Sequence, residues 1–191
     1  MQATDIAELV ARRVPGDPAK AAPVTAADGM PTIEVDRESL PEVGLALRDT
    51  PELAFHVLID ATAVDFLPRE PRYEIIYLLL SPGVAGYGDS PKRLRMKVHV
   101  PGHDPRVPTL SGVWQSANWA EREIYDLFGI TFDRHPDLRR ILMPEDWEGF
   151  PLRRDYPVQI KQPVKTYEPL QVSEEEFVAN IRAAKRGSQH E

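Results

Sequence analysis

The spacing of apolar residues predicts three helices in the first two thirds of the chain. Apolar positions three and four residues apart predict helices at residues 4–13, 38–49 and 118–128. Thr4 and Asn118 are the predicted N-caps of the first and third helices, because their side chains can accept the unpaired N–H groups of a first turn. Gly129 offers the left-handed residue at which the third helix ends.

Runs rich in β-branched and other apolar residues predict five strands. They lie at residues 22–26, 32–35, 55–66, 73–80 and 93–100. Asp28-Gly29 predicts a hairpin turn between the first two. The fourth run is apolar at nearly every position, so we expect both of its faces to be covered. The fifth alternates apolar residues with Arg93, Arg95, Lys97 and His99, which predict a solvated face, with partner binding as the alternative.

This order of elements predicts an α+β domain of two layers, with helices on one face of a mixed or antiparallel sheet. We place the domain at residues 1–157 and an extended C-terminal arm at 158–191. The arm carries one short helix, because Ser173 and Glu176 form a capping box ahead of Phe177, Val178 and Ile181.

Composition excludes several classes of function. The chain has 191 residues, with 30 acidic against 23 basic residues and a net charge of −7. This balance argues against nucleic-acid binding and against a polybasic membrane contact. The absence of cysteine excludes disulfides, a thiol nucleophile, a thiolate zinc site and an all-cysteine iron–sulfur cluster.

Targeting and catalytic motifs are also missing from the sequence. No apolar run has the length of a membrane span, and the first residues lack a secretory signal, so we expect a soluble cytoplasmic protein. No two of the five histidines have helical metal spacing, and no phosphate-binding glycine loop occurs. His135-Pro136 is expected to form a turn with a hydrogen-bonded imidazole. We therefore predict no catalytic residue, no metal and no cofactor in this chain.

The segment 119–156 has an unusual composition, with six arginines, nine acidic residues and no lysine. Arginine is preferred in buried or interfacial ion pairs, and interleaved aromatic residues are typical of interfaces. One interpretation is an ordered docking segment that a partner covers; the other is a loop with a folded-back charge network. The predicted interface residues are Trp119, Glu121, Arg122, Glu123, Tyr125, Asp126, His135, Asp137, Arg139, Arg140, Trp147, Arg153, Arg154, Asp155 and Tyr156.

Acid–base catalysis by this segment is the competing hypothesis from another class. Glu121 and Glu123 are two residues apart and so do not share a helix face. Arg122 and Asp126 have the spacing of an ordinary ion pair one helical turn apart. A free-standing enzyme is therefore the weaker alternative.

Three long runs carry a resemblance to a known family. They are Trp119 to Ile130, His135 to Leu142 and Glu148 to Pro157, supported upstream by Leu58 to Asp65 and Asp104 to Pro108. Together they resemble the C subunit of NADH-quinone oxidoreductase, the thirty-kilodalton subunit family of respiratory complex I. The resemblance covers about residues 30 to 157 and is most specific at 119–157.

The resemblance implies a two-layer fold with a mixed five-stranded sheet and no FMN, iron–sulfur cluster or metal in this chain. It implies a structural role beside complex I subunits D, B and I, with the main packing against D. Together with the rest of the complex, these subunits pass electrons from NADH to quinone and pump protons. Such a protein is peripheral, on the cytoplasmic side of the cell membrane. The same residues fit the homologous subunit of a related membrane hydrogenase or other electron-input complex.

Overall fold

The computed structural model describes residues 1–14, 20–83, 90–157, 173 and 175–179. The chain divides into two units, Met1–Tyr156 and Pro157–Glu191. In the second unit, residues 175–179 are helical, and the Ser173 hydroxyl accepts the N–H of Glu176 at 3.2 Å, as the capping box predicts. The extended arm ahead of this helix and Ile181 lie outside the described residues.

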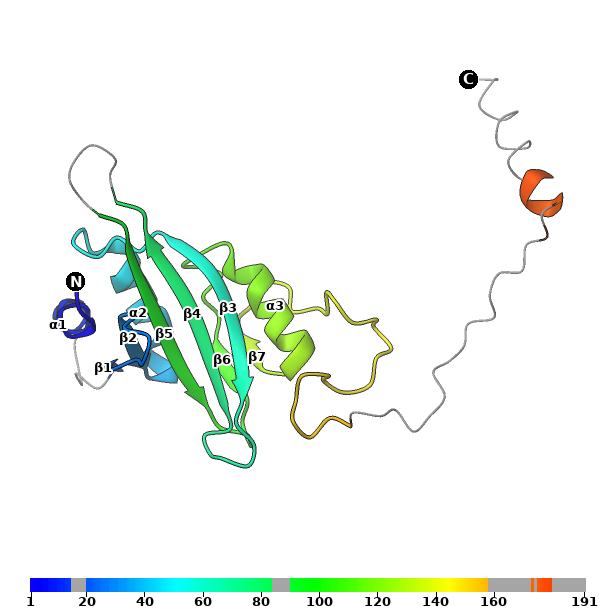
Figure 1. Cartoon of the computed structure of the whole chain (residues 1–191), viewed down its shortest axis with the longest axis horizontal. Coiled ribbons are helices and arrows are strands. Elements are labelled where there is room, and N and C mark those ends of the chain that lie inside the picture. The colour runs from blue at the N-terminus through cyan, green and yellow to red at the C-terminus, as the bar shows by residue number, and fades with distance from the viewer. Residues whose placement is uncertain (15–19, 84–89, 158–172, 174, 180–191) are drawn as a thin grey trace, which may run out of the picture. The chain divides into compact units, whose positions relative to one another are not determined.

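The first unit is built on a mixed five-stranded sheet, which confirms the predicted fold class (Figure 1). Its strands are β1 (Ala21–Val24), β2 (Thr32–Val35), β3 (Val57–Asp65), β4 (Tyr73–Ser81) and β5 (Lys92–Val100). Their order across the sheet is β1-β2-β5-β4-β3. Strands β1 and β3 are therefore the two edges, and within this sheet the β2–β5 pair is parallel while the other three pairs are antiparallel.

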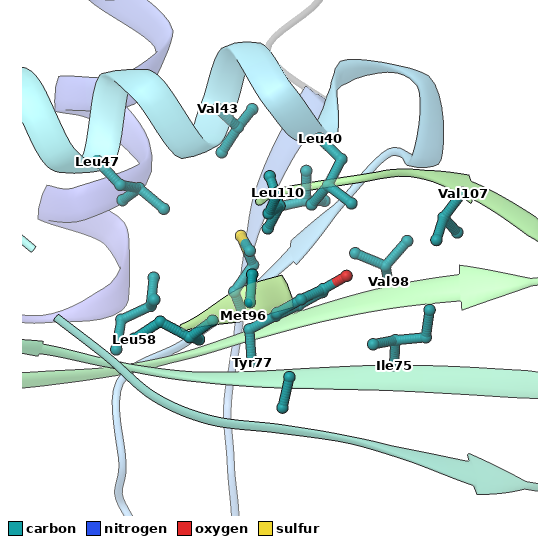
Figure 2. Packing of buried hydrophobic residues seen from close by; sticks show 14 of the residues in the cluster. Leu40, Val43, Leu47, Leu58, Ile75, Tyr77, Met96, Val98, Val107 and Leu110 are labelled. Carbon is teal, nitrogen blue, oxygen red and sulfur yellow. The ribbon is translucent and has the colours of Figure 1, made fainter. Parts of the chain in front are cut away.

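The helices lie on one face of this sheet. They are α1 (Ala3–Arg13), α2 (Leu40–Asp49) and α3 (Ala117–Phe128), with the 3₁₀ turn η2 (Arg37–Ser39) leading into α2. Figure 2 shows Leu40, Val43 and Leu47 of α2 directed toward Tyr77 and Met96 of the sheet, all five fully buried. Burying each such side chain stabilises the fold by about 1.5–3 kcal/mol, so α2 is a main element of the core.

The other face of the sheet is less covered than the sequence predicts. Ile76, Leu78 and Leu80 of β4 are half-buried, whereas the alternate residues from Tyr73 to Ser81 are buried. The expectation that both faces of this strand are covered is therefore confirmed for the face toward the helices and only partly met for the other face. Basic β5 side chains partly shield the open face: Lys97 pairs with Glu74 at 2.9 Å, and Arg95 pairs with Asp28 at 2.6 Å.

Helix starts and short strands also differ from the prediction. α1 begins after Gln2, whose N–H donates to the Asp5 carboxylate at 2.8 Å, and not at Thr4. α3 begins after Ser116, so Asn118 is not its N-cap. The strands β6 (Arg106–Pro108) and β7 (Thr131–Asp133) form a separate parallel pair that the sequence did not reveal, because three residues are too few for a periodic pattern.

None of the described helices is long and apolar enough to cross a membrane.

Candidate partner interface

Asp126, on α3, anchors the irregular segment that follows the helix. Its side chain is fully buried, and one carboxylate oxygen accepts the backbone N–H groups of Ile141, Leu142 and Met143 at 3.0, 2.7 and 2.8 Å. The other oxygen accepts the Arg140 guanidinium at 2.8 Å. Burial alone would raise the pKa of Asp126, but these donors outweigh it and hold that pKa below its usual value.

Arg122 does not form the ion pair with Asp126 that the spacing suggests. Its guanidinium donates to the carbonyl oxygens of Arg139 and Arg140 at 3.1 and 3.4 Å and lies 5.1 Å from the centre of the Trp119 ring. An exposed pair one turn apart is worth only a few tenths of a kcal/mol, about 0.2–0.5. Asp126 instead has four donors in a buried site, which stabilise its charge far more.

Arg140 joins α3 to two turns of the irregular segment. Besides its ion pair with Asp126, it donates to the carbonyl oxygens of Trp147 and Gly149 at 3.2 and 3.0 Å. Its neighbour Arg139 makes a two-point pair with Asp137, with both distances 2.7 Å, but leaves 71 % of its side chain exposed. Arg140 therefore holds the segment against α3, whereas Arg139 makes an exposed local ion pair.

Arg140→Lys is expected to lower the free energy of unfolding by about 1.5–3 kcal/mol, because lysine cannot donate to three groups through a planar fork. Arg139→Lys is the matched control and should change it by less than about 0.5 kcal/mol. Urea unfolding of the full-length variants measures both values. Equal losses at the two positions would contradict the internal role of Arg140.

Arg153 closes the segment onto the C-terminal end of α3. Its guanidinium donates to the carbonyl oxygens of Phe128 and Gly129 and lies 4.5 Å from the centre of the Phe150 ring. Gly129 ends the helix at φ +70°, as predicted, and a Cβ there would lie 2.4 Å from Phe150. The last carbonyls of a helix favour a cation, so Arg153 both caps α3 and positions Phe150.

Glu121 and His135 occupy a closed site behind α3. Both side chains are fully buried, and His135 Nε2 lies 3.9 Å from a carboxylate oxygen of Glu121. Glu121 accepts the Thr109 hydroxyl and the N–H of Leu110, and burial raises its pKa from 4.5 to about 7. His135 Nε2 lies 3.1 Å from the carbonyl oxygen of Asn118, and its Nδ1 accepts the Asp137 N–H at 3.1 Å. The predicted turn with a hydrogen-bonded imidazole is therefore confirmed.

A third buried carboxylate, Asp65, links the segment to the sheet, and the sequence did not reveal it. Asp65, at the end of β3, accepts Arg72 at 2.7 Å and the N–H of Arg154 at 2.9 Å, and its pKa falls to about 2 although burial opposes the shift. Arg72 also pairs with Asp155 at 2.8 Å. The contact joins positions 83 residues apart, so no local spacing could have indicated it.

The predicted interface residues thus separate into two groups. Those held within the segment or against α3 are Glu121, Arg122, Tyr125, Asp126, His135, Arg140, Trp147, Arg153 and Tyr156. Those with more accessible side chains are Trp119, Glu123, Asp137, Arg139, Arg154 and Asp155. A charge network folds the segment back, as the second interpretation expects, and docking of a partner on the exposed set stays a prediction.

The described residues show no arrangement typical of a metal site. In the parts of the chain that the structure describes, no three histidine or carboxylate side chains come close enough together to bind a metal ion. The Asp126 carboxylate is wrapped by its donors, and Glu121 is closed from solvent. Neither carboxylate is placed to exchange a proton with a substrate.

Residues 33–162 match the family described as "Respiratory-chain NADH dehydrogenase, 30 Kd subunit". The chain belongs to this family. It is 46 % identical over 136 residues to the C subunit of NADH-quinone oxidoreductase from Roseiflexus sp. (strain RS-1), covering 71 % of this chain and 75 % of the relative. It is also 46 % identical over 132 residues to the protein of that description from Geobacter sulfurreducens, covering 69 % and 76 %. The resemblance seen in the sequence is confirmed.

Two solved structures share the fold of this chain. The trypsin-resistant fragment 1–134 of Nqo5 superposes with a TM-score of 0.56 at 32 % identity, covering 72 % of this chain and all of the fragment. A chain of the membrane-bound sulfane sulfur reductase, an archaeal respiratory membrane complex, gives a TM-score of 0.64 at 20 % identity, covering 81 % and 85 %. The second likeness shows that the fold of the 30 kDa family also occurs there.

Proposed function

We propose that the chain is a structural subunit of a proton-pumping NADH:quinone oxidoreductase and takes no direct part in electron transfer. The observation that carries this proposal is the family match over residues 33–162, with relatives of the 30 kDa family that are 46 % identical. The match contains the whole 119–157 segment, and Asp126 and Arg140 hold the irregular part of that segment, after β7, against α3. An irregular surface that is held in one conformation suits a permanent interface with another subunit.

The partners would be complex I subunits D, B and I, chiefly D. In this proposal FMN and the iron–sulfur clusters belong to partner subunits, because this chain has no cysteine to hold a cluster. The chain would reach the membrane through the complex, peripherally and on its cytoplasmic side. Its contribution to respiratory electron transport and proton translocation is to position its neighbours.

A related electron-input complex is the second candidate, favoured by the fold shared with the sulfane sulfur reductase chain. Affinity purification of the full-length chain from its source organism, followed by mass spectrometry, distinguishes the two. We expect the NADH-binding and quinone-site subunits to co-purify in equal amounts. Hydrogenase or sulfur reductase subunits in their place would support the second candidate, and a chain recovered alone would contradict both.

The purified chain alone is expected to be colourless and inert. The reason is the lack of cysteine together with the absence of metal-spaced histidines and nucleotide-binding loops in the sequence. Visible absorbance, metal content and NADH oxidation are the measurements. A stoichiometric bound flavin or metal, or turnover by the isolated chain, would favour the free-standing enzyme instead.

A further inference from the structure

An exposed apolar surface lies where the edge strand β3 meets the N-terminal half of α3. Trp119 exposes 65 % of its surface and Ile59 51 %, and Val57, on the same strand, exposes 41 %. A hollow of about 360 Å³ lies here, lined by Leu58 and Ile59 of β3, by Trp119 and Ala120 of α3, and by Ile141. We call this region the β3–α3 surface.

The β3–α3 surface has the properties of an interface that lacks its partner. Burial of an apolar side chain of this size is worth about 1.5–3 kcal/mol, so leaving Trp119 and Ile59 in water forgoes that stabilisation. Exposed apolar patches of this kind mark protein interaction sites, and tryptophan is enriched at their energetic centres. The strand pairing of β3 shifts between Leu58 and Asp60, and such an irregularity discourages the addition of another strand. The surface therefore suits inserted side chains.

The charge of the β3–α3 surface indicates which side chain fits. Asp60 and Glu123 also line the hollow and are exposed, and neither carboxylate makes a hydrogen bond or ion pair with any described residue. The neighbouring cation, Arg122, is already engaged by two backbone carbonyls and the Trp119 ring. Two free carboxylates beside an aromatic ring complement an arginine, whose planar guanidinium stacks on aromatic rings and binds carboxylates through two hydrogen bonds.

We propose that the β3–α3 surface receives an arginine side chain from a neighbouring subunit, surrounded by apolar partner residues on Trp119 and Ile59. This inference rests on the proposed function, because it requires the chain to sit in a complex. It adds the docking site and the chemistry of the segment that docks. The partner segment is basic and apolar, and belongs to another polypeptide.

The first test reverses the two charges. In the source organism, the double variant Asp60→Lys, Glu123→Lys should lower recovery of the chain with its complex at least about tenfold, because like charges would then face the partner arginine. Glu8→Lys is the matched control, since Glu8 is also an exposed glutamate in mid-helix and without a described ion pair, on α1. Its recovery should stay within about twofold of the wild type. The melting temperature of each isolated full-length chain shows whether folding is intact.

The second test does not depend on charge reversal. A photo-crosslinking amino acid at Trp119 should capture a partner peptide that contains arginine, and the same group at Glu8 should not. Crosslinks to residues 158–191 of the same chain, or to a second copy, would overturn the inference. So would normal complex recovery by the double variant while the wild type co-purifies. If the wild type itself joins no complex, the proposed function has failed instead.

Discussion

Asp126→Asn is expected to lower the free energy of unfolding by about 3–5 kcal/mol, the range measured when one partner of a buried ion pair is removed. The substitution keeps the shape of the side chain but removes its charge. Arg140 would then be left half-buried without its carboxylate. The amide nitrogen would face a donor in either orientation, the Arg140 guanidinium or the three backbone N–H groups. The segment 140–150 should detach from α3 while the sheet stays folded at low denaturant.

Urea unfolding at pH 7 measures the loss, and proteolysis within 140–150 reports the detachment. Asp137→Asn is the control, because that carboxylate pairs with a largely exposed arginine and should matter by less than about 1 kcal/mol. Folding lowers the pKa of Asp126, so its contribution is complete above its ordinary value of 3.8 and fades as the pH falls through the lower folded value. An equal effect of the two substitutions at pH 7 would contradict the anchoring role.

Glu121 should make the stability of the domain depend on pH in the opposite direction. Burial raises its pKa from 4.5 to about 7, so in that window the folded protein holds a proton that the unfolded chain has released. The Glu121 contribution is therefore greatest below pH 4.5 and is lost as the pH rises toward 7. A shift of this size corresponds to about 3 kcal/mol. Glu121→Gln should remove this dependence, because an amide has no proton to lose.

The measurement is the free energy of unfolding at pH 5 and at pH 8 for wild type and Glu121→Gln. From pH 5 to pH 8 the stability of the variant should rise by about 2.5 kcal/mol relative to that of the wild type. Glu123→Gln, exposed on the same helix, should gain nothing. A Glu121→Gln variant that tracks the wild type at both pH values would show that the carboxylate keeps its charge in the fold.

Local patterns in the sequence predicted the elements well where one periodic run decides the structure. The apolar stripe of α3 and the glycine at its end both lie within a short stretch of sequence. The strand β4 carries a continuous apolar run, and β5 alternates apolar with basic residues. The dipeptide His135-Pro136 also correctly predicted a turn with a hydrogen-bonded imidazole. The fold class follows from the order of such elements.

The contacts that fix the 119–157 segment could not be read from the sequence, because they join residues through irregular chain. Asp126 had a correctly spaced cation in Arg122, yet it binds Arg140, fourteen residues further on. Asp65, Arg72 and Asp155 meet only once the sheet and the segment are both in place. The composition of the segment still gave a useful indication, since arginines without lysines suit planar, partly buried pairing.

Deletion of the gene from the source organism, followed by complementation, tests the structural role most directly. NADH-dependent quinone reduction by isolated membranes and the amount of intact complex on a native gel are measured together. We expect both to be lost together and both to return with the wild-type chain. An intact and active complex assembled without this chain would contradict the account.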